Sequence, residues 1–228
     1  MFWVLGGISE VFENILSYKA VFSSVKNGVS LWNKSVLVFD KDELSTEHKD
    51  LFVQKFREIV GIETYSPNAY TFESTLFTDM AKTSKLLRLL LLKATGLETA
   101  EAEILNDLTI NYVTYKTTLE AKFNEEYHRN TFFRYKNSKI EKTPGVFGRK
   151  AVNMTDYDLG VDIKKHYAED LARGEFYKLM DKSDVENVIK QTIDKHSFNF
   201  SIESDFIEII KLVDKSTWIA EWDFLNNI

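Results

Sequence analysis

The stretch Ser35-Val36-Leu37-Val38-Phe39-Asp40-Lys41-Asp42-Glu43 decides the fold that the sequence predicts. Its continuous apolar run is typical of a strand buried on both faces, as in a parallel sheet. Open parallel sheets bind ligands beyond the carboxyl ends of their strands, where Asp40 and Asp42 come. Two carboxylates two residues apart repel each other unless a cation lies between them, and Mg²⁺ is the usual cation among hard oxygen ligands. The alternative is a local turn or helix cap that uses both aspartates.

The segments around this stretch predict alternating strands and helices. The sequence predicts a short apolar strand at residues 2–5, followed by Gly6-Gly7 and a helical pattern. After Asp42, apolar residues recur at helical spacing as far as Gly61, which ends that helix. A further strand at 62–65 precedes a helix at 70–80, near whose start Glu73 lies. Strands separated by helices indicate a parallel sheet with crossover connections.

Beyond residue 82 the pattern is helical. A buried helix over 86–92 ends at Gly96, and one long helical pattern runs from 98 to about 129. A last helix carries Trp218 and Trp222 one turn apart, which favours core positions, with a partner-binding stripe as the alternative. The predicted fold class is therefore α/β: a small parallel-sheet core in the N-terminal third, residues 1–82, followed by a mainly helical domain, residues 83–228.

A basic segment at 129–150 differs from the rest of the chain. It holds seven lysine and arginine residues against one glutamate, with aromatic residues between them, and Thr143-Pro144-Gly145 marks it as a loop. Basic and aromatic side chains together suit phosphate contacts and base stacking. We therefore expect a nucleic-acid contact here, and the alternative is a solvated connector. The candidate binding residues are Arg129, Arg134, Lys136, Arg149 and Lys150.

Composition excludes several classes of function. The chain of 228 residues has no cysteine, which excludes disulfides, cysteine-ligated zinc and thiol catalysis, and fits a reducing compartment such as the cytoplasm. No apolar run approaches the roughly 20 residues that cross a bilayer, and the N-terminus lacks a basic signal region. The net charge of −6 argues against a chain that coats nucleic acid along its whole surface.

The remaining motifs leave carboxylates as the candidate chemistry. The four histidines have no metal-ligand spacing, and the sequence contains neither Gly-x-Ser-x-Gly nor a Walker A motif. A serine hydrolase and a self-contained P-loop ATPase are therefore not expected. The candidate catalytic and metal-binding residues are Asp40, Asp42 and Glu73.

Three segments together resemble the later part of a TOPRIM domain: residues 2–7 with Gly6-Gly7, residues 36–43 with Asp40 and Asp42, and residues 70–76 with Glu73. The similarity is to OLD-type nucleases and to relatives that act beside ABC-type ATPases in phage defence. It implies cleavage of phosphodiester bonds in DNA or tRNA with Mg²⁺ or Mn²⁺. It assigns Asp40 and Asp42 as metal ligands and Glu73 as a further member of the shell. The same resemblance implies an ABC-type ATPase partner, and the long helical pattern leaves a homo-oligomer open.

One departure from the family pattern leaves two other interpretations open. The family's first strand ends in a catalytic glutamate, which this sequence does not supply, so the site is incomplete or degenerate without another chain or segment. A non-catalytic assembly module, binding an ATPase or itself through the long helix and the C-terminal tryptophans, is the first alternative. The second is a haloacid-dehalogenase-type phosphatase with Asp40 as nucleophile, although Leu44 stands where that family has Thr or Val.

Overall fold

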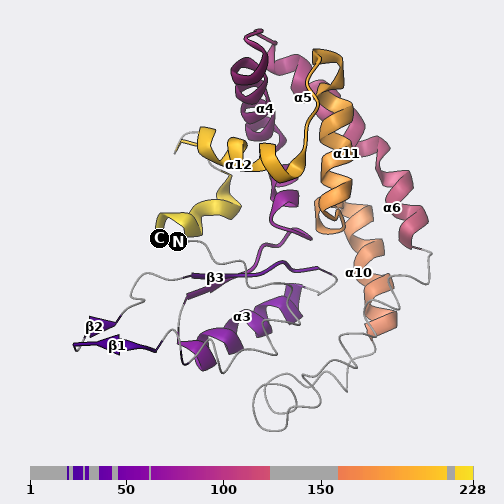
Figure 1. Ribbon diagram of the computed structural model, residues 1–228. Helices are drawn as coiled ribbons and strands as arrows, with labels where there is room; N and C mark the ends of the chain where they lie inside the picture. Colours follow the sequence, from indigo (N-terminus) through magenta and orange to yellow (C-terminus); the bar gives the residue numbers. More distant parts are fainter. Residues whose placement is uncertain are drawn as a thin grey trace. The chain divides into compact units, whose positions relative to one another are not determined.

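The computed structural model is a mixed α/β structure in which helices predominate, which confirms the predicted fold class (Figure 1). The chain divides into two compact units. The first comprises Met1–Pro67, Glu125–His166 and Asn226–Ile228, and the second Asn68–Asn124 and Tyr167–Leu225. The structure describes residues 20, 23–27, 29–30, 36–42, 46–61, 63–123, 159–214 and 219–227.

A two-stranded hairpin comes first in the described chain. Strand β1 (Val25–Lys26) pairs antiparallel with β2 (Val29–Ser30). Asn27, between the two strands, has a φ of 53°, in the left-handed region that asparagine tolerates better than most residues. The strand and helix predicted before residue 20 lie outside the described residues.

The first unit contains the predicted strand–helix–strand arrangement. Strand β3 (Val36–Val38) and β4 (Glu63–Tyr65) are parallel, with Leu37 level with Thr64. Helix α3 (Thr46–Val60) connects them. It ends where predicted, since Gly61 has a φ of 79° and its N–H donates to the Arg57 carbonyl at 2.9 Å. A parallel pair needs such a crossover, because its strands run in the same direction.

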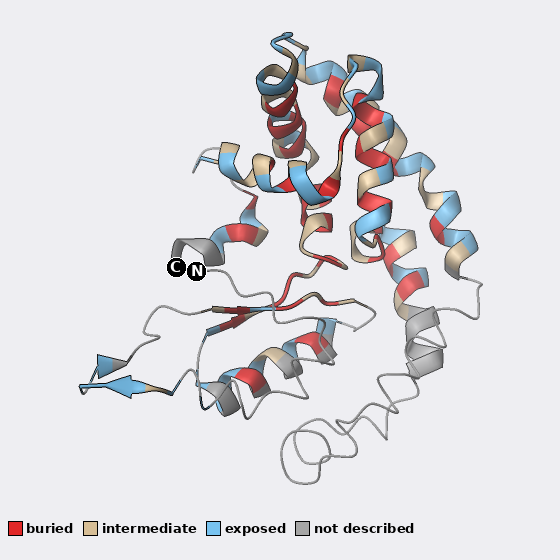
Figure 2. Cartoon of the chain, in the orientation of Figure 1, coloured by how far each residue is buried: buried red, intermediate tan, exposed pale blue. Residues whose placement is uncertain are grey.

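The parallel strands bury one face more completely than the other. Leu37, Phe39 and Phe56 are buried, and the rings of Phe39 and Phe56 lie 5.3 Å apart between centroids, which packs the end of β3 against α3 (Figure 2). Val38, which points to the opposite face, is 38% exposed. The prediction of a strand buried on both faces is therefore wrong at this position. Side chains alternate along a strand, so a helix on one face covers only every second residue.

Helices make up most of the second unit. In chain order the elements after β4 are η1 (Glu73–Thr78), α4 (Met80–Thr95), α5 (Glu101–Thr114), α6 (Lys116–Phe123), α10 (Leu159–Arg173), η3 (Phe176–Lys178), α11 (Lys182–Ile193), η4 (Asp194–His196), α12 (Ile202–Leu212) and η5 (Ala220–Asn227). Buried leucines on α4 and buried residues on α5 and α11 form its core, seen as the red faces of these helices in Figure 2.

Helix α4 shows how local sequence sets both of its ends. The Asp79 carboxylate accepts a hydrogen bond from the Lys82 N–H at 3.0 Å, and this cap separates α4 from the short 3₁₀ helix η1. The single helix predicted over 70–80 is thus divided at Asp79. At the other end Gly96 has a φ of 72° and its N–H donates to the Leu92 carbonyl at 2.9 Å, as the sequence predicts.

The long helix predicted from 98 to about 129 is two helices in the described chain. Helix α5 ends at Thr114 and α6 begins at Lys116, with Tyr115 between them. The backbone bonds continue across this point, since Tyr115 N–H donates to Asn111 and Leu119 N–H donates to Tyr115. Tyr115 has a ψ of −20°, which is closer to 3₁₀ than to α-helical geometry, so the α-helix is interrupted at one residue without an open loop.

Trp222 lies in the core of the second unit, as predicted. It has no exposed surface, its indole N–H donates to the Thr75 hydroxyl at 2.7 Å, and it packs on Phe72 and Phe206 with centroid distances of 6.0 and 6.2 Å. A partner-binding role for Trp222 is therefore wrong, because the side chain is covered by its own unit. Trp218 lies outside the described residues.

Residues 68–82 make their contacts with the second unit. The Tyr70 N–H donates to the Tyr177 carbonyl at 3.0 Å, and Asn68 donates to Glu221. The sequence predicts a domain boundary after residue 82, which stays a prediction.

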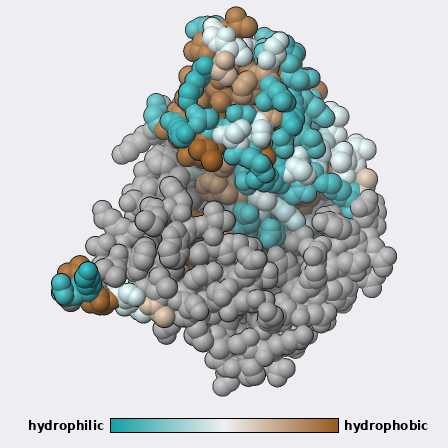
Figure 3. All heavy atoms as spheres, in the orientation of Figure 1, coloured by the Kyte–Doolittle hydropathy of each residue, from teal (hydrophilic) through white to brown (hydrophobic). Residues whose placement is uncertain are grey.

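Hydrophilic residues cover much of the visible described surface, with hydrophobic residues between them (Figure 3). Within the described part of the chain, no helix has both the length and the apolar composition needed to cross a membrane.

Candidate functional site

The candidate site lies where the two parallel strands of the first unit end. The Phe39 N–H donates to the Tyr65 carbonyl at 3.2 Å, so the pairing extends one residue beyond β3. Asp40 follows directly. Buried Phe39, held against Phe56 of α3, fixes where the chain leaves the sheet. The structure therefore places Asp40 and Asp42 beyond the carboxyl end of a parallel strand, as the sequence predicts.

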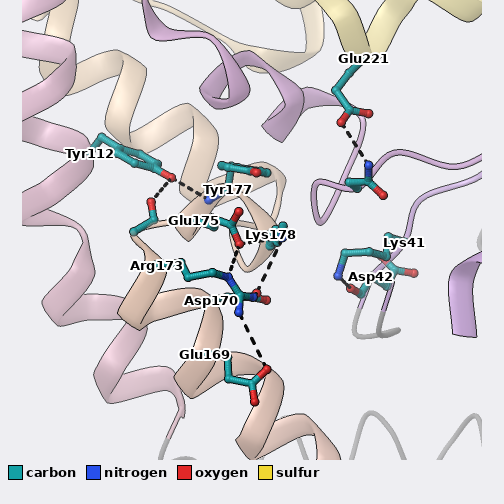
Figure 4. Close-up of polar contacts among 12 residues, drawn as sticks. Lys41, Asp42, Tyr112, Glu169, Asp170, Arg173, Glu175, Tyr177, Lys178 and Glu221 are labelled. Atoms are coloured by element: carbon teal, nitrogen blue, oxygen red, sulfur yellow. Dashed lines mark hydrogen bonds and ion pairs between the residues drawn. The ribbon is translucent and has the colours of Figure 1, made fainter. Parts of the chain in front are cut away.

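Both aspartates are half-buried, and the lysine between them is buried. Lys41 is only 4% exposed, and its Nζ donates to the Asp42 backbone carbonyl at 3.2 Å (Figure 4). Asp42 has a φ of 49°, a left-handed conformation that aspartate visits more readily than branched residues. The turn thus combines two carboxylates with the buried side chain of Lys41. The interpretation of the sequence did not identify Lys41 as a site residue.

Ser66 is a second site residue that sequence reasoning missed. It follows β4 directly and is only 5% exposed. Its Oγ is buried and has no hydrogen-bond partner among the described residues. Buried hydroxyls nearly always have a partner, so this one is unusual. Its position immediately after a predicted parallel strand was the available signal.

Glu73, the third predicted ligand, stands elsewhere in the fold. It is half-buried and begins η1, just after Phe72. Glu73 belongs to the second unit, whereas Asp40 and Asp42 belong to the first. Its membership of one shell with the two aspartates stays a prediction. The predicted nucleic-acid contacts Arg129, Arg134, Lys136, Arg149 and Lys150 lie outside the described residues.

The Asp40–Asp42 turn offers donors that suit a single hard cation. Mg²⁺ is usually held by one or two protein carboxylates and keeps several waters, which two aspartates can satisfy. A pair of ions about 4 Å apart needs more carboxylates than this turn supplies. Among the described residues no group of three or more His, Asp or Glu is arranged to hold a metal ion.

A second polar cluster, around Tyr112 of the second unit, has a different character. The Tyr112 hydroxyl donates to the Gly174 carbonyl at 3.2 Å and accepts from the Tyr177 N–H at 3.0 Å (Figure 4). Beside it, Glu175 accepts from Arg173 and from Lys178, both at 2.7 Å, and Arg173 also pairs with Asp170. We refer to these residues as the Tyr112 cluster: Tyr112, Asp170, Arg173, Gly174, Glu175, Tyr177 and Lys178.

Electrostatics in the Tyr112 cluster favour a structural role. Burial raises the pKa of the Tyr112 hydroxyl and, together with the charge of Glu175, raises the pKa of Tyr177 to about 12. Burial alone would raise the pKa of Glu175, but hydrogen bonds from Lys178 and Arg173 outweigh it and lower that pKa. These groups keep their ordinary charge states near neutral pH. The Tyr112 hydroxyl is bonded to the backbone of Gly174 and Tyr177, and Glu175 is bonded to Arg173 and Lys178, so these contacts fix the turn after α10.

No protein-family model, curated protein or solved structure matches the chain.

Proposed function

We propose that this chain is a TOPRIM-like component of a metal-dependent nuclease, acting in the cytoplasm on DNA or tRNA. The observation that carries the proposal is the parallel pair β3 and β4 joined by α3, with Asp40 and Asp42 directly beyond the end of β3. This is the arrangement in which open α/β sheets bind their ligands. The resemblance to OLD-type nucleases adds the reaction class and places the protein in phage defence beside an ABC-type ATPase.

In this proposal Asp40 and Asp42 hold one Mg²⁺ or Mn²⁺, and Glu73 stays a third ligand that only the family resemblance implies. Held by the two carboxylates, a divalent ion would supply Lewis-acid chemistry to a phosphoryl oxygen of the substrate. The two carboxylates supply the negative charge that attracts the ion. The positive charge of the buried Lys41 ammonium beside them offsets part of this negative charge. The basic segment at 129–150 guides the nucleic-acid backbone to this edge.

Cleavage assays with matched variants test the proposal. Wild-type protein is incubated with DNA and with tRNA in Mg²⁺, in Mn²⁺ and in EDTA. We expect metal-dependent cleavage that falls to the EDTA level in Asp40→Asn/Asp42→Asn. The control is Asp194→Asn/Asp223→Asn, which removes the same charge from exposed positions of the second unit. Cleavage that survives the Asp40/Asp42 change contradicts the proposal.

A non-catalytic assembly module is the second candidate function, and one observation favours it. Ile110 and Val113 on α5 are 54% and 55% exposed, one helical turn apart. Two large apolar side chains side by side on a surface are a feature of association sites. A solution mass above that of one chain, reduced by Ile110→Ser/Val113→Ser but not by Ala102→Ser on the same helix, would support this function. A monomeric wild type that recovers no partner from cells contradicts it.

A further inference from the structure

Helix α5 carries a second apolar line in addition to the one that faces its core. Its buried residues Ile104, Leu108 and Tyr112 lie on the side where α5 packs against α4 and α11. Ile110 and Val113 are large, apolar and exposed. A surface helix with one set of neighbours keeps a single apolar stripe and a polar opposite face. The second apolar line therefore indicates a second partner.

The exposed apolar pair belongs to a longer line with heptad spacing. Four exposed residues recur at intervals of four, three and four, and positions with this spacing lie along one side of a helix. We refer to them as the α5 seam: Asn106, Ile110, Val113 and Thr117.

The α5 seam continues from α5 into α6. Backbone hydrogen bonds are unbroken across Tyr115, which separates the two helices. Leu119 of α6, seven residues after Tyr112, is buried as Tyr112 is. The buried line thus keeps its phase across Tyr115, and the exposed line keeps its phase with it.

The α5 seam carries no charge, although charged residues make up 28% of the chain. The glutamates beyond its two ends have lysine partners within the second unit: Glu103 pairs with Lys195 at 2.7 Å, and Glu120 pairs with Lys116 at 3.5 Å. Contact between two copies of one surface brings like charges together, which is unfavourable. A seam without charge, flanked by neutralised glutamates, therefore meets the electrostatic condition for contact with itself.

The order of residues along the α5 seam is symmetric about its midpoint. From either end it reads polar, branched apolar, branched apolar, polar, at intervals of four, three and four. In a two-fold contact, residue i of one copy meets residue j of the other, and j meets i. Two antiparallel seams therefore place Asn106 opposite Thr117 and Ile110 opposite Val113, in both halves of the contact. An unrelated partner would require no such symmetry.

We infer that this chain forms a two-fold dimer in which the α5 seams of two copies pack antiparallel. The inference rests on the association surface of the second candidate function, and it adds the partner, a second copy, and the register. The seam is about 16 Å long, so the contact is small beside the roughly 800 Å² per partner of a standard interface. The dimer therefore dissociates on dilution.

Cysteine crosslinking tests both the partner and the register, because the chain has no cysteine of its own. Full-length Asn106→Cys and Thr117→Cys, with tags of different size, are oxidised mildly, alone and mixed. We expect the mixed disulfide to form at least about tenfold faster than either homodimer. In the antiparallel register a residue and its own copy lie about 16 Å apart along the helix, which a disulfide cannot span. Ser204→Cys on the exposed face of α12 is the matched control.

The apolar centre of the seam is tested in the same assay. With Ile110→Ser/Val113→Ser added to both cysteine variants, the mixed disulfide should fall to the level of the Ser204→Cys control. The urea midpoint should stay within error of the wild type, because the substituted side chains are exposed. Sedimentation should show a mass that rises with concentration in the wild type and stays at one chain in Ile110→Ser/Val113→Ser.

The outcomes separate this inference from the proposed functions. Cysteine variants that each crosslink to themselves and not to each other overturn it, and so does a dimer that Ile110→Ser/Val113→Ser leaves intact. If the wild type stays monomeric at millimolar concentration but recovers another protein from cells through Ile110 and Val113, the inference fails and the assembly function stands. If the mixed disulfide forms while no metal-dependent cleavage is found, the dimer stands and the nuclease proposal fails.

Discussion

The edge beyond β3 and β4 and the Tyr112 cluster are both polar and partly buried, but they differ in how their groups are satisfied. In the Tyr112 cluster the phenol bonds to the backbone of Gly174 and Tyr177, and the guanidinium and the ammonium bond to the carboxylate of Glu175. At the strand edge the buried Ser66 hydroxyl has no partner among the described residues. Internally bonded groups stabilise a fold, whereas groups left unsatisfied in it are the ones that a ligand can complete.

The largest expected effect comes from the aromatic core beside η1. Trp222→Ala removes a fully buried indole and its hydrogen bond to Thr75, and it should lower the unfolding free energy by about 3–5 kcal/mol. Trp222→Phe should cost clearly less, because a ring still fills most of the space. Urea unfolding followed by circular dichroism measures both. Equal costs for the two variants would show that packing does not dominate at this position.

Tyr112→Phe is the next largest change and tests the satisfied cluster directly. The variant keeps the ring but leaves the Tyr177 N–H and the Gly174 carbonyl without their hydroxyl partner, so we expect a loss of about 1–3 kcal/mol. Urea unfolding of the variant and the wild type gives the value. A cost near zero would mean that the cluster does not hold the turn after α10, and the contrast with the strand edge would lose its basis.

The pH dependence of the same cluster gives a smaller effect with a fixed sign. The pKa of Glu175 is lowered in the folded state, so its contribution to stability is present above the unfolded pKa and is lost as the pH falls through the folded one. In Glu175→Gln the decline in unfolding free energy between about pH 5 and pH 3 should be shallower than in the wild type. Parallel pH profiles of the two proteins would contradict the assigned role of Lys178 and Arg173.

The smallest expected effect on stability is at the strand edge. Ser66→Ala removes a buried hydroxyl that has no partner in the described chain, so the unfolding free energy should not fall and should rise by up to about 1 kcal/mol. Urea unfolding beside Tyr112→Phe makes the comparison in one experiment. If Ser66→Ala lowered the unfolding free energy as much as Tyr112→Phe, the Ser66 hydroxyl would stabilise the fold as the Tyr112 hydroxyl does. The contrast between the strand edge and the Tyr112 cluster would then be wrong.

Local sequence was sufficient to predict the strand–helix–strand unit. The apolar run of β3, the helical spacing of α3 and the stop at Gly61 each depend on neighbouring residues, and all three are found. Gly96 at the end of α4 follows the same rule. The cap at Asp79 could also have been predicted, since aspartate before a helix is a standard start signal. It was missed because the residues before it also follow a helical pattern.

Other features depend on contacts between residues distant in sequence and could not be predicted in this way. Trp222 bonds to Thr75, 147 residues earlier in the chain. The burial of Lys41 and Ser66 follows from the packing around β3, β4 and α3, and no spacing rule signals it. The change at Tyr115 leaves the apolar repeat of α5 and α6 intact, because a single shift in ψ does not alter which residues face the core.

Metal binding by the strand edge tests the central claim most directly. Calorimetric titration of the full chain with Mn²⁺ and Mg²⁺ measures it without requiring a substrate or a partner. We predict that the wild type and Asp194→Asn/Asp223→Asn bind the ion and that Asp40→Asn/Asp42→Asn does not. Equal binding by all three proteins, or no binding by the wild type, would contradict the assignment of this edge as a metal site.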